Sequence, residues 1–147
     1  MKIGKIIAIV IILLIVILGG VFLTQSKTKD TTRSITATQD NSGEIAPHYL
    51  KYSEENLAAG KTNGRPVLYF WASWCPTCKV LDEELKERSG ELPDDVTILQ
   101  VNYDTEKELK QKYNIVQQHT LVQVDSEGNE VHNWIGGGIE TIKQQLI

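Results

Sequence analysis

The feature that most constrains this chain is an apolar run, residues 67–72, that leads directly into a Cys-x-x-Cys motif at Cys75 and Cys78. The run is rich in β-branched and aromatic residues and has no polar alternation, which predicts a strand buried on both faces. Pro76 suits the first position of a helix, because its missing N–H would have no partner there. The spacing of apolar and charged residues then predicts a helix over residues 76–87. The first cysteine is therefore expected at a helix N-terminus, and the second one turn later.

The number of cysteines favours reactive chemistry over structural cross-linking. Cys75 and Cys78 are the only two cysteines among 147 residues. A disulfide-stapled scaffold would carry more cysteines, and a structural zinc site usually has four protein ligands. The thiolate is the reactive form of cysteine, and the N–H groups and dipole at a helix N-terminus stabilise it. We therefore predict that Cys75 is the attacking nucleophile and that Cys78 is the resolving cysteine.

The pattern around this motif predicts an α/β fold. Strands are expected at residues 67–72, 96–101, 121–124 and 130–134. Helices are expected to begin at Ser53, Pro76, Thr105 and about Ile139, and the first three are expected to end near Gly60, Glu87 and Tyr113. Ser53 and Thr105 are the predicted N-caps of their helices. This order predicts a sandwich in which helices flank a central mixed sheet.

The N-terminal segment has the pattern of a membrane anchor. Residues 6–23 are apolar and uncharged, and Lys2 and Lys5 precede them. A bilayer span needs about 17–25 such residues, and positive charge before the span holds the N-terminus in the cytoplasm. We predict a short cytoplasmic end at residues 1–5, a transmembrane signal-anchor helix at 6–23, and a single-pass cell-membrane protein whose domain is extracytoplasmic. A cleaved signal peptide is the alternative, although its apolar core is usually shorter.

A polar segment separates the predicted anchor from the predicted domain. Residues 24–45 are almost wholly polar, which predicts a flexible linker, and residues 46–147 have the composition of one globular domain. The formal net charge is −4, and no cluster of lysine and arginine follows the N-terminus. This charge distribution is not typical of proteins that bind nucleic acid.

Residues 70–79 read Phe-Trp-Ala-Ser-Trp-Cys-Pro-Thr-Cys-Lys and resemble the active-site segment of the thioredoxin family. They match the family pattern Phe-x-Ala-x-Trp-Cys-x-x-Cys-Lys at every fixed position, and the likeness covers about residues 47–147. The resemblance implies a thioredoxin-like sandwich and a thiol–disulfide oxidoreductase with no cofactor beyond its redox-active disulfide. The side chains implied around the pair are Trp74, Pro76, Thr77, His119 and Thr120.

For an exported domain, the resemblance implies two kinds of partner. The first is the thiols or disulfides of other exported proteins, and the second is a membrane-bound redox partner that recycles the cysteine pair. Reductant, oxidant and isomerase remain open as the direction of the reaction. A redox-inactive interaction domain and a copper or zinc chaperone on the same fold are the alternatives.

Three features depart from the family pattern. His119 stands directly before Thr120, where thioredoxins place a cis-proline. Tyr69 stands where many thioredoxins carry a buried acid. Pro76 and Thr77 replace the Gly-Pro dipeptide of cytoplasmic reductants.

His119 has three open interpretations. It is a loop residue that only fills the space of the proline, or an imidazolium that stabilises a nearby thiolate. In the third interpretation it joins Cys75 and Cys78 as a ligand for copper or zinc.

Overall fold

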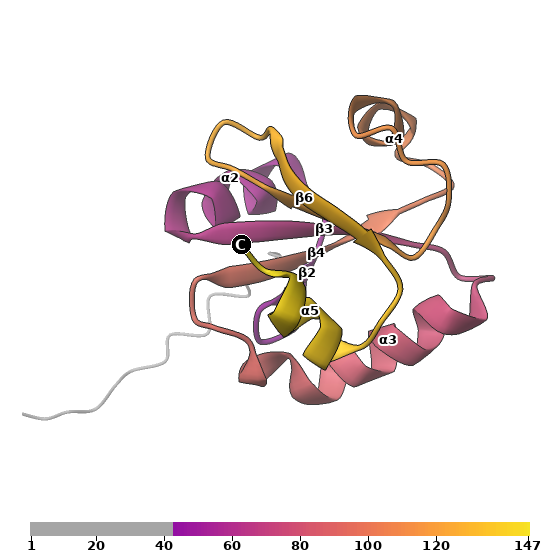
Figure 1. Ribbon diagram of the computed structural model, residues 1–147, viewed down its shortest axis with the longest axis horizontal. Helices are drawn as coiled ribbons and strands as arrows, with labels where there is room; N and C mark the ends of the chain where they lie inside the picture. The colour runs from indigo at the N-terminus through magenta and orange to yellow at the C-terminus, as the bar shows by residue number, and fades with distance from the viewer. Residues whose placement is uncertain (1–42) are drawn as a thin grey trace, which may run out of the picture. The chain divides into compact units, whose positions relative to one another are not determined.

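The computed structural model describes residues 43–147 (Figure 1). The strands are β1 (Glu44–Ala46), β2 (Tyr49–Lys51), β3 (Arg65–Trp71), β4 (Val96–Asn102), β5 (Thr120–Val124) and β6 (Glu130–Ile135). The helices are α2 (Glu54–Asn63), α3 (Pro76–Arg88), α4 (Lys107–Lys112) and α5 (Ile139–Gln145), and a short 3-10 helix, η1 (Ser89–Glu91), follows α3. The predicted cytoplasmic end, the predicted membrane anchor and residues 24–42 of the predicted linker lie outside the described residues. Within residues 43–147, no helix has the length and apolar character needed to cross a membrane.

The six strands form one mixed sheet in the order β1-β2-β4-β3-β5-β6. Strand β3 lies inside the sheet, parallel to β4 and antiparallel to β5. Strand β2 also runs parallel to β4, whereas β1 and β6 are antiparallel to their neighbours. The predicted mixed sheet is therefore confirmed, and β3, which precedes the cysteine pair, lies near its middle.

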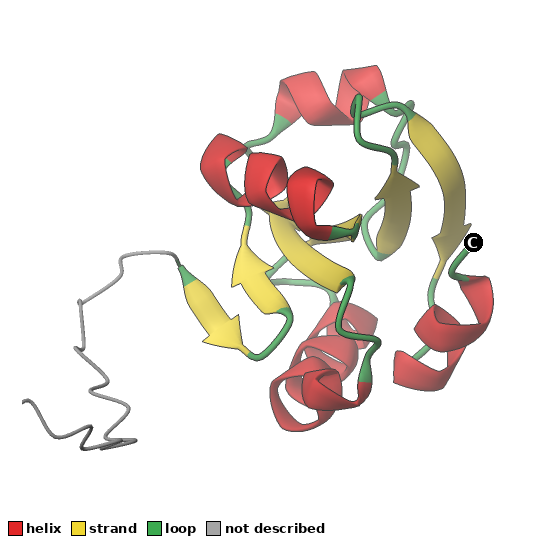
Figure 2. Cartoon of the chain, turned by 90° about the vertical axis from the view of Figure 1, so that its left-hand side faces the viewer, coloured by secondary structure: helices red, strands yellow, loops and turns green. Residues whose placement is uncertain are grey.

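Helices cover both faces of this sheet (Figure 2). Side chains of α3 and α5 pack on one face against Val67 and Tyr69 of β3. Side chains of α2 and α4 pack on the other face against Leu68 and Phe70 of the same strand. All four of these β3 side chains are fully buried, which confirms the prediction of a strand buried on both faces.

The start of the domain differs from the prediction. Strand β1 begins at Glu44 and pairs with β2, so the folded part starts two residues before the expected boundary at residue 46. Neither strand was predicted. Each is only three residues long, and so short a segment shows no clear period in the sequence.

The two predicted N-caps have different outcomes. Ser53 caps α2 as predicted, because its hydroxyl accepts a hydrogen bond from the Asn56 N–H at 3.0 Å. Thr105 does not cap α4, which begins two residues later and has Glu106 at its N-cap position without a side-chain cap. The side chain of Asn102 instead accepts hydrogen bonds from the N–H groups of Asp104 and Thr105, and this turn delays the helix.

Helix α2 is longer than predicted. It was expected to end near Gly60 but continues to Asn63, and the N–H of Gly64 closes its last turn on the Gly60 carbonyl at 2.9 Å. Gly60 is buried inside the helix. The glycine that ends α2 is therefore the second of the two, at the turn into β3.

Candidate active site

Cys75 and Cys78 form a disulfide at the point where β3 passes into α3. Cys75 is the N-cap of α3, with an extended backbone, and Pro76 occupies the first turn as predicted. The Cys75 Sγ accepts a hydrogen bond from the Cys78 N–H at 3.1 Å. This N–H is one of the donors at the helix N-terminus that have no partner within the helix. The same donor would stabilise a thiolate at Cys75 after reduction.

Both cysteines are buried in this disulfide form. The exposed fraction is 1% for Cys75 and 0% for Cys78, so exposure does not separate the predicted nucleophile from the predicted resolving residue. Their assigned roles stay predictions that rest on position along α3.

The side chain of Trp74, directly before Cys75, is held by hydrogen bonds but remains exposed. Its side chain is 55% exposed, yet its Nε1 donates to both carboxylate oxygens of Asp104, at 3.0 and 3.2 Å. Tyr103 contacts the indole edge-on, with ring centroids 6.4 Å apart. Residues that follow β4 thus hold this indole in place while one side stays open to solvent.

Thr77 contacts the sulfur of Cys75 directly. Its Oγ1 lies 3.3 Å from the Cys75 Sγ, and the hydroxyl is free to donate to a thiolate there. Thr77 is exposed on the first turn of α3, two residues after Cys75, so the start of this helix is enough to bring the two side chains together.

His119 reaches the cysteines from the segment before β5. Because β3 and β5 are antiparallel, with Phe70 opposite Thr120, the end of β3 lies beside the start of β5. The His119 N–H donates to the Phe70 carbonyl at 2.8 Å, and its own carbonyl accepts from the Gly136 N–H at 2.9 Å. These bonds fix His119 at a φ of 62°, a left-handed conformation that is uncommon for residues other than glycine.

The peptide bond before His119 is trans, as is every peptide bond within residues 43–147. Thr120 is buried, and its hydroxyl donates to the Gln117 carbonyl at 2.9 Å. Thr120 thus fastens the segment that carries His119.

The imidazole of His119 is buried and has an unused nitrogen. The side chain is 9% exposed, and burial lowers its pKa below the ordinary 6.5, although a backbone hydrogen bond with Gly137 acts in the opposite direction. Its Nε2 has no hydrogen-bond partner within the described residues. One ligand atom each from Cys75, Cys78 and His119 lie within 4.8 Å of one another. The structure therefore places His119 next to the pair, where burial favours the neutral imidazole.

A hollow of about 260 Å³ opens beside the pair. Thr77, Val80, Leu81 and Glu84 of α3 line one side, and His119, Gly137 and Gly138 line the other. Val80 is 70% exposed there. The side chains of Val80 and Leu81 give this hollow apolar surface.

Comparison with known proteins gives this geometry a family. The thioredoxin family model matches residues 47–146. The chain belongs to the thioredoxin family. It is 28% identical to thioredoxin of Bacillus subtilis over 98 residues, which cover 67% of this chain and 93% of that protein. It is 34% identical to thioredoxin of Chlamydia trachomatis over 84 residues, which cover 57% of this chain and 80% of that protein.

Solved structures agree with this assignment. A thioredoxin-like protein from Edwardsiella tarda superposes with a TM-score of 0.54 at 28% identity, over 64% of this chain and 93% of that one. Reduced thioredoxin pre-protein from Schistosoma mansoni gives a TM-score of 0.53 at 27% identity, over 67% and 96%. The chain is thus a thiol–disulfide oxidoreductase of the thioredoxin family, with Cys75 and Cys78 as its cysteine pair.

This thioredoxin-family chain has a buried acid that the sequence did not reveal. Asp82 is 7% exposed and lies on α3, one turn beyond Cys78. Its Oδ1 accepts hydrogen bonds from the Tyr49 hydroxyl at 2.6 Å and from the Gln100 amide at 2.8 Å, and Lys86 pairs with it at 2.7 Å. In the sequence, Asp82 looks like the other acidic residues of α3. Only its contacts with Tyr49 and Gln100, which are distant in the sequence, distinguish it from them.

Tyr69 connects this acid to the cysteine pair. Its hydroxyl donates to the Cys78 carbonyl at 2.9 Å. Burial, and then the charge of Asp82, raise the pKa of Tyr69, so the hydroxyl keeps its proton and remains a donor. Tyr69, at the position of the family's strand acid, thus acts here as a neutral hydrogen-bond donor behind α3.

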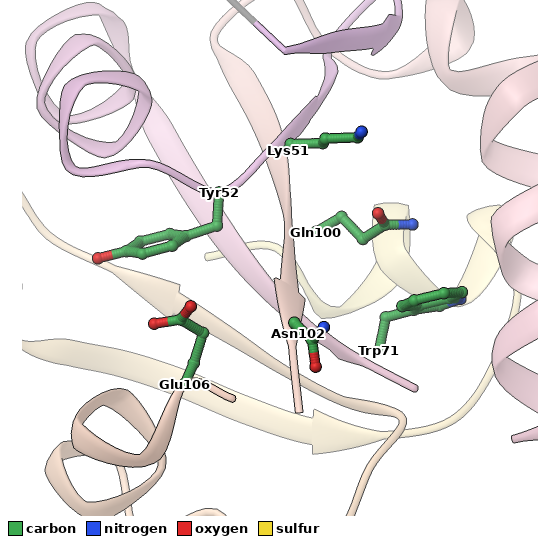
Figure 3. Close-up of a pocket in the computed structure, with 6 residues that line it drawn as sticks. All are labelled: Lys51, Tyr52, Trp71, Gln100, Asn102 and Glu106. Carbon is green, nitrogen blue, oxygen red and sulfur yellow. The ribbon is translucent and has the colours of Figure 1, made fainter. Parts of the chain in front are cut away.

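A separate pocket of about 420 Å³ shares no lining residue with the hollow beside His119 (Figure 3). Its lining residues are Lys51, Tyr52, Trp71, Gln100, Asn102 and Glu106. Neither cysteine nor His119 borders it.

Proposed function

We propose that this chain is a membrane-tethered oxidoreductase that exchanges the Cys75–Cys78 disulfide with cysteines of exported proteins. The observation that carries the proposal is the Cys75 sulfur at the N-cap of α3, near a hollow lined in part by Val80 and Leu81. The apolar run at residues 6–23, with Lys2 and Lys5 before it, supports the location.

The exchange proceeds in two steps. In the reduced chain, the Cys75 thiolate attacks one sulfur of a substrate disulfide, which forms a mixed disulfide and releases the other substrate sulfur as a thiolate. Cys78, having lost its proton, then attacks the Cys75 sulfur and releases the second substrate thiolate. The substrate gains two electrons, and its two thiolates take up the proton lost by Cys78 and one proton from solvent. The chain keeps the Cys75–Cys78 disulfide. The oxidising direction runs through the same steps in reverse.

A recycling partner completes the cycle. Each turnover changes the oxidation state of the pair by two electrons, so a second dithiol or disulfide must restore it. We infer that a redox partner in the same membrane does this, because the tether would hold the pair near such a protein.

The reduction potential of the pair decides the direction. The full-length chain in detergent would be equilibrated with mixtures of reduced and oxidised glutathione or dithiothreitol. A value near −270 mV, about that of thioredoxin, would assign a reductant, and a value near −120 mV would assign an oxidant that forms disulfides. Failure of the pair to exchange with either couple would overturn the proposal.

The role of each cysteine is tested by trapping. With a disulfide-bonded exported protein as substrate, Cys78→Ser is expected to accumulate a mixed disulfide through Cys75, because no second thiol resolves it. The matched variant Cys75→Ser is expected to accumulate none. The reverse pattern would exchange the two roles.

A further inference from the structure

The cysteine pair and His119 form a compact set of metal ligands. One donor atom from each lies within 4.8 Å of the other two, and all three residues are buried. Thiolate and imidazole donors stand about 2.0–2.3 Å from a bound ion, so three of them around one ion lie about 3.5–4 Å apart. Reduction of the disulfide frees the two sulfurs, and a small movement then brings all three donors to this spacing.

The unused nitrogen of His119 points to a ligand. A buried polar atom without a partner costs about 1–3 kcal/mol and calls for an explanation. Of the two ring nitrogens of His119, Nε2 is the one without a partner within residues 43–147. We therefore assign the hydrogen bond with the Gly137 backbone to Nδ1. A proton held on Nδ1 by a backbone carbonyl leaves a lone pair on Nε2, which is the arrangement that metal-binding histidines use.

We propose that the reduced protein binds one Cu(I) ion through Cys75, Cys78 and His119. This site goes beyond disulfide exchange and uses the same two sulfurs in another way. Two thiolates are soft donors that select Cu(I) or zinc, and imidazole binds both copper and zinc. Zinc in a closed site takes four ligands, whereas within the described residues the cluster has three. Glu84, which lines the same hollow, is paired with Arg88 at 2.8 Å.

Metal binding and disulfide exchange exclude each other at this site. Cu(I) binds the two sulfurs as thiolates, so binding releases the protons that they still carry and involves no electron transfer. The disulfide form has no thiolate to offer. A loaded chain would therefore have no nucleophile for exchange until the ion leaves.

Competition with a coloured chelator tests the site. The full-length chain in detergent would be reduced, freed of reductant without oxygen, and titrated with Cu(I) against bathocuproine disulfonate. We expect one Cu(I) per reduced chain, none for the oxidised chain, and X-ray absorption from two sulfurs and one nitrogen.

His119→Asn is the decisive variant. Asparagine tolerates a left-handed backbone but cannot reach the ion as the imidazole does. It should weaken Cu(I) binding by at least about tenfold. His48→Asn is the matched control, because His48 has a φ of 59° and contacts the Val96 carbonyl, at the opposite end of β4 from Asn102. Circular dichroism would confirm that both variants are folded.

Besides a failure to bind Cu(I), two results would overturn the proposal. One is Cu(I) binding by His119→Asn with wild-type affinity, which would leave the two cysteines as the whole site. The other is a stoichiometric zinc complex that Cu(I) fails to displace. The metal-free wild type tests disulfide exchange separately, so a chain that exchanges disulfides but binds no Cu(I) would overturn this inference alone.

Discussion

Among single residues, Asp82 is the centre of a buried hydrogen-bond network one turn of α3 beyond Cys78. It accepts hydrogen bonds from Tyr49 and Gln100 and pairs with Lys86, and its charge helps to keep the Tyr69 hydroxyl protonated. Removing this buried carboxylate is costly, because the fully buried Tyr49 hydroxyl is then left without an acceptor, and Gln100 and Lys86 each lose one partner.

Asp82→Ala should therefore lower the free energy of unfolding by about 2–4 kcal/mol. Asp82→Asn keeps an acceptor oxygen and should cost less, about 1–2 kcal/mol. Urea denaturation measures both values. Glu83→Ala, on the exposed side of the same turn, is the control and should stay within about 0.5 kcal/mol of wild type. An equal, small effect of all three substitutions would contradict a structural role for Asp82.

The Thr77 hydroxyl should increase the reactivity of Cys75. It lies 3.3 Å from the sulfur, and a donated hydrogen bond worth ~1 kcal/mol favours the thiolate about fivefold. Thr77→Val keeps the shape of the side chain but removes the donor. The rate at which iodoacetamide alkylates Cys75 in the reduced chain at pH 7 should fall about fivefold. Thr62→Val, a threonine on α2, should leave this rate unchanged, and a fall in both variants would contradict the assigned hydrogen bond.

His119 should make the stability of the fold sensitive to acid. Burial lowers its pKa below 6.5, so as pH falls through this value the unfolded chain takes up a proton that the folded chain resists. The contribution to stability is full above about pH 6.5 and declines until the folded pKa is reached. Urea unfolding at pH 7.5 and 5.5 should show a smaller loss in His119→Asn than in wild type. An identical loss in the two chains would argue against a buried neutral imidazole, and His48→Asn serves as the control.

Local sequence predicted some of these residues and not others. Cys75 and Pro76 were placed correctly because a helix N-terminus has strong local preferences. Asp82 and Asp104 were missed because their roles depend on partners far along the chain, such as Tyr49 and Trp74. No pattern within one helix or loop contains that information.

At the scale of elements, helices and strands stabilised by local contacts were predicted from the sequence, and those that depend on distant contacts were missed. Strand β3 and helix α3 were predicted closely, since burial on both faces and a capped, amphipathic helix leave clear periods. Strands β5 and β6 were also predicted to within one residue at each end. Strands β1 and β2 were missed because three residues form a strand only through their pairing with the sheet.

The turn from α2 into β3 requires glycine for close approach. A Cβ on Gly64 would collide with the backbone carbonyl of Asp95, and the next residue, Arg65, donates its N–H to that carbonyl at 2.6 Å and pairs with the Asp95 carboxylate. Gly64→Ala should therefore destabilise the fold by about 1–3 kcal/mol. Thermal unfolding measures the effect. Gly90→Ala is the matched control, since a Cβ there meets open space, and its melting temperature should not fall. Equal melting temperatures in the two variants would show that the turn can move.

At the scale of the described domain, the sheet order explains how the site is assembled. The ends of β3 and β4 lie at one edge because these strands are parallel, and β5 starts there because it is antiparallel to β3. This edge therefore collects the N-terminus of α3, Asp104 after β4, His119 before β5 and Gly137 after β6. The family motif predicted the cysteines, whereas the surroundings of His119 follow from the topology.

The location of the whole chain gives the last prediction. If residues 6–23 span the membrane with Lys2 and Lys5 inside, everything after them is outside the cytoplasm. In a chain with both cysteines changed to serine, Ser126→Cys places one thiol on the exposed turn between β5 and β6. A membrane-impermeant maleimide should label this thiol in intact cells. Gly4→Cys is the matched control and should react only after lysis. Labelling of the Ser126 reporter only in lysed cells would place the domain in the cytoplasm and remove exported proteins as its substrates.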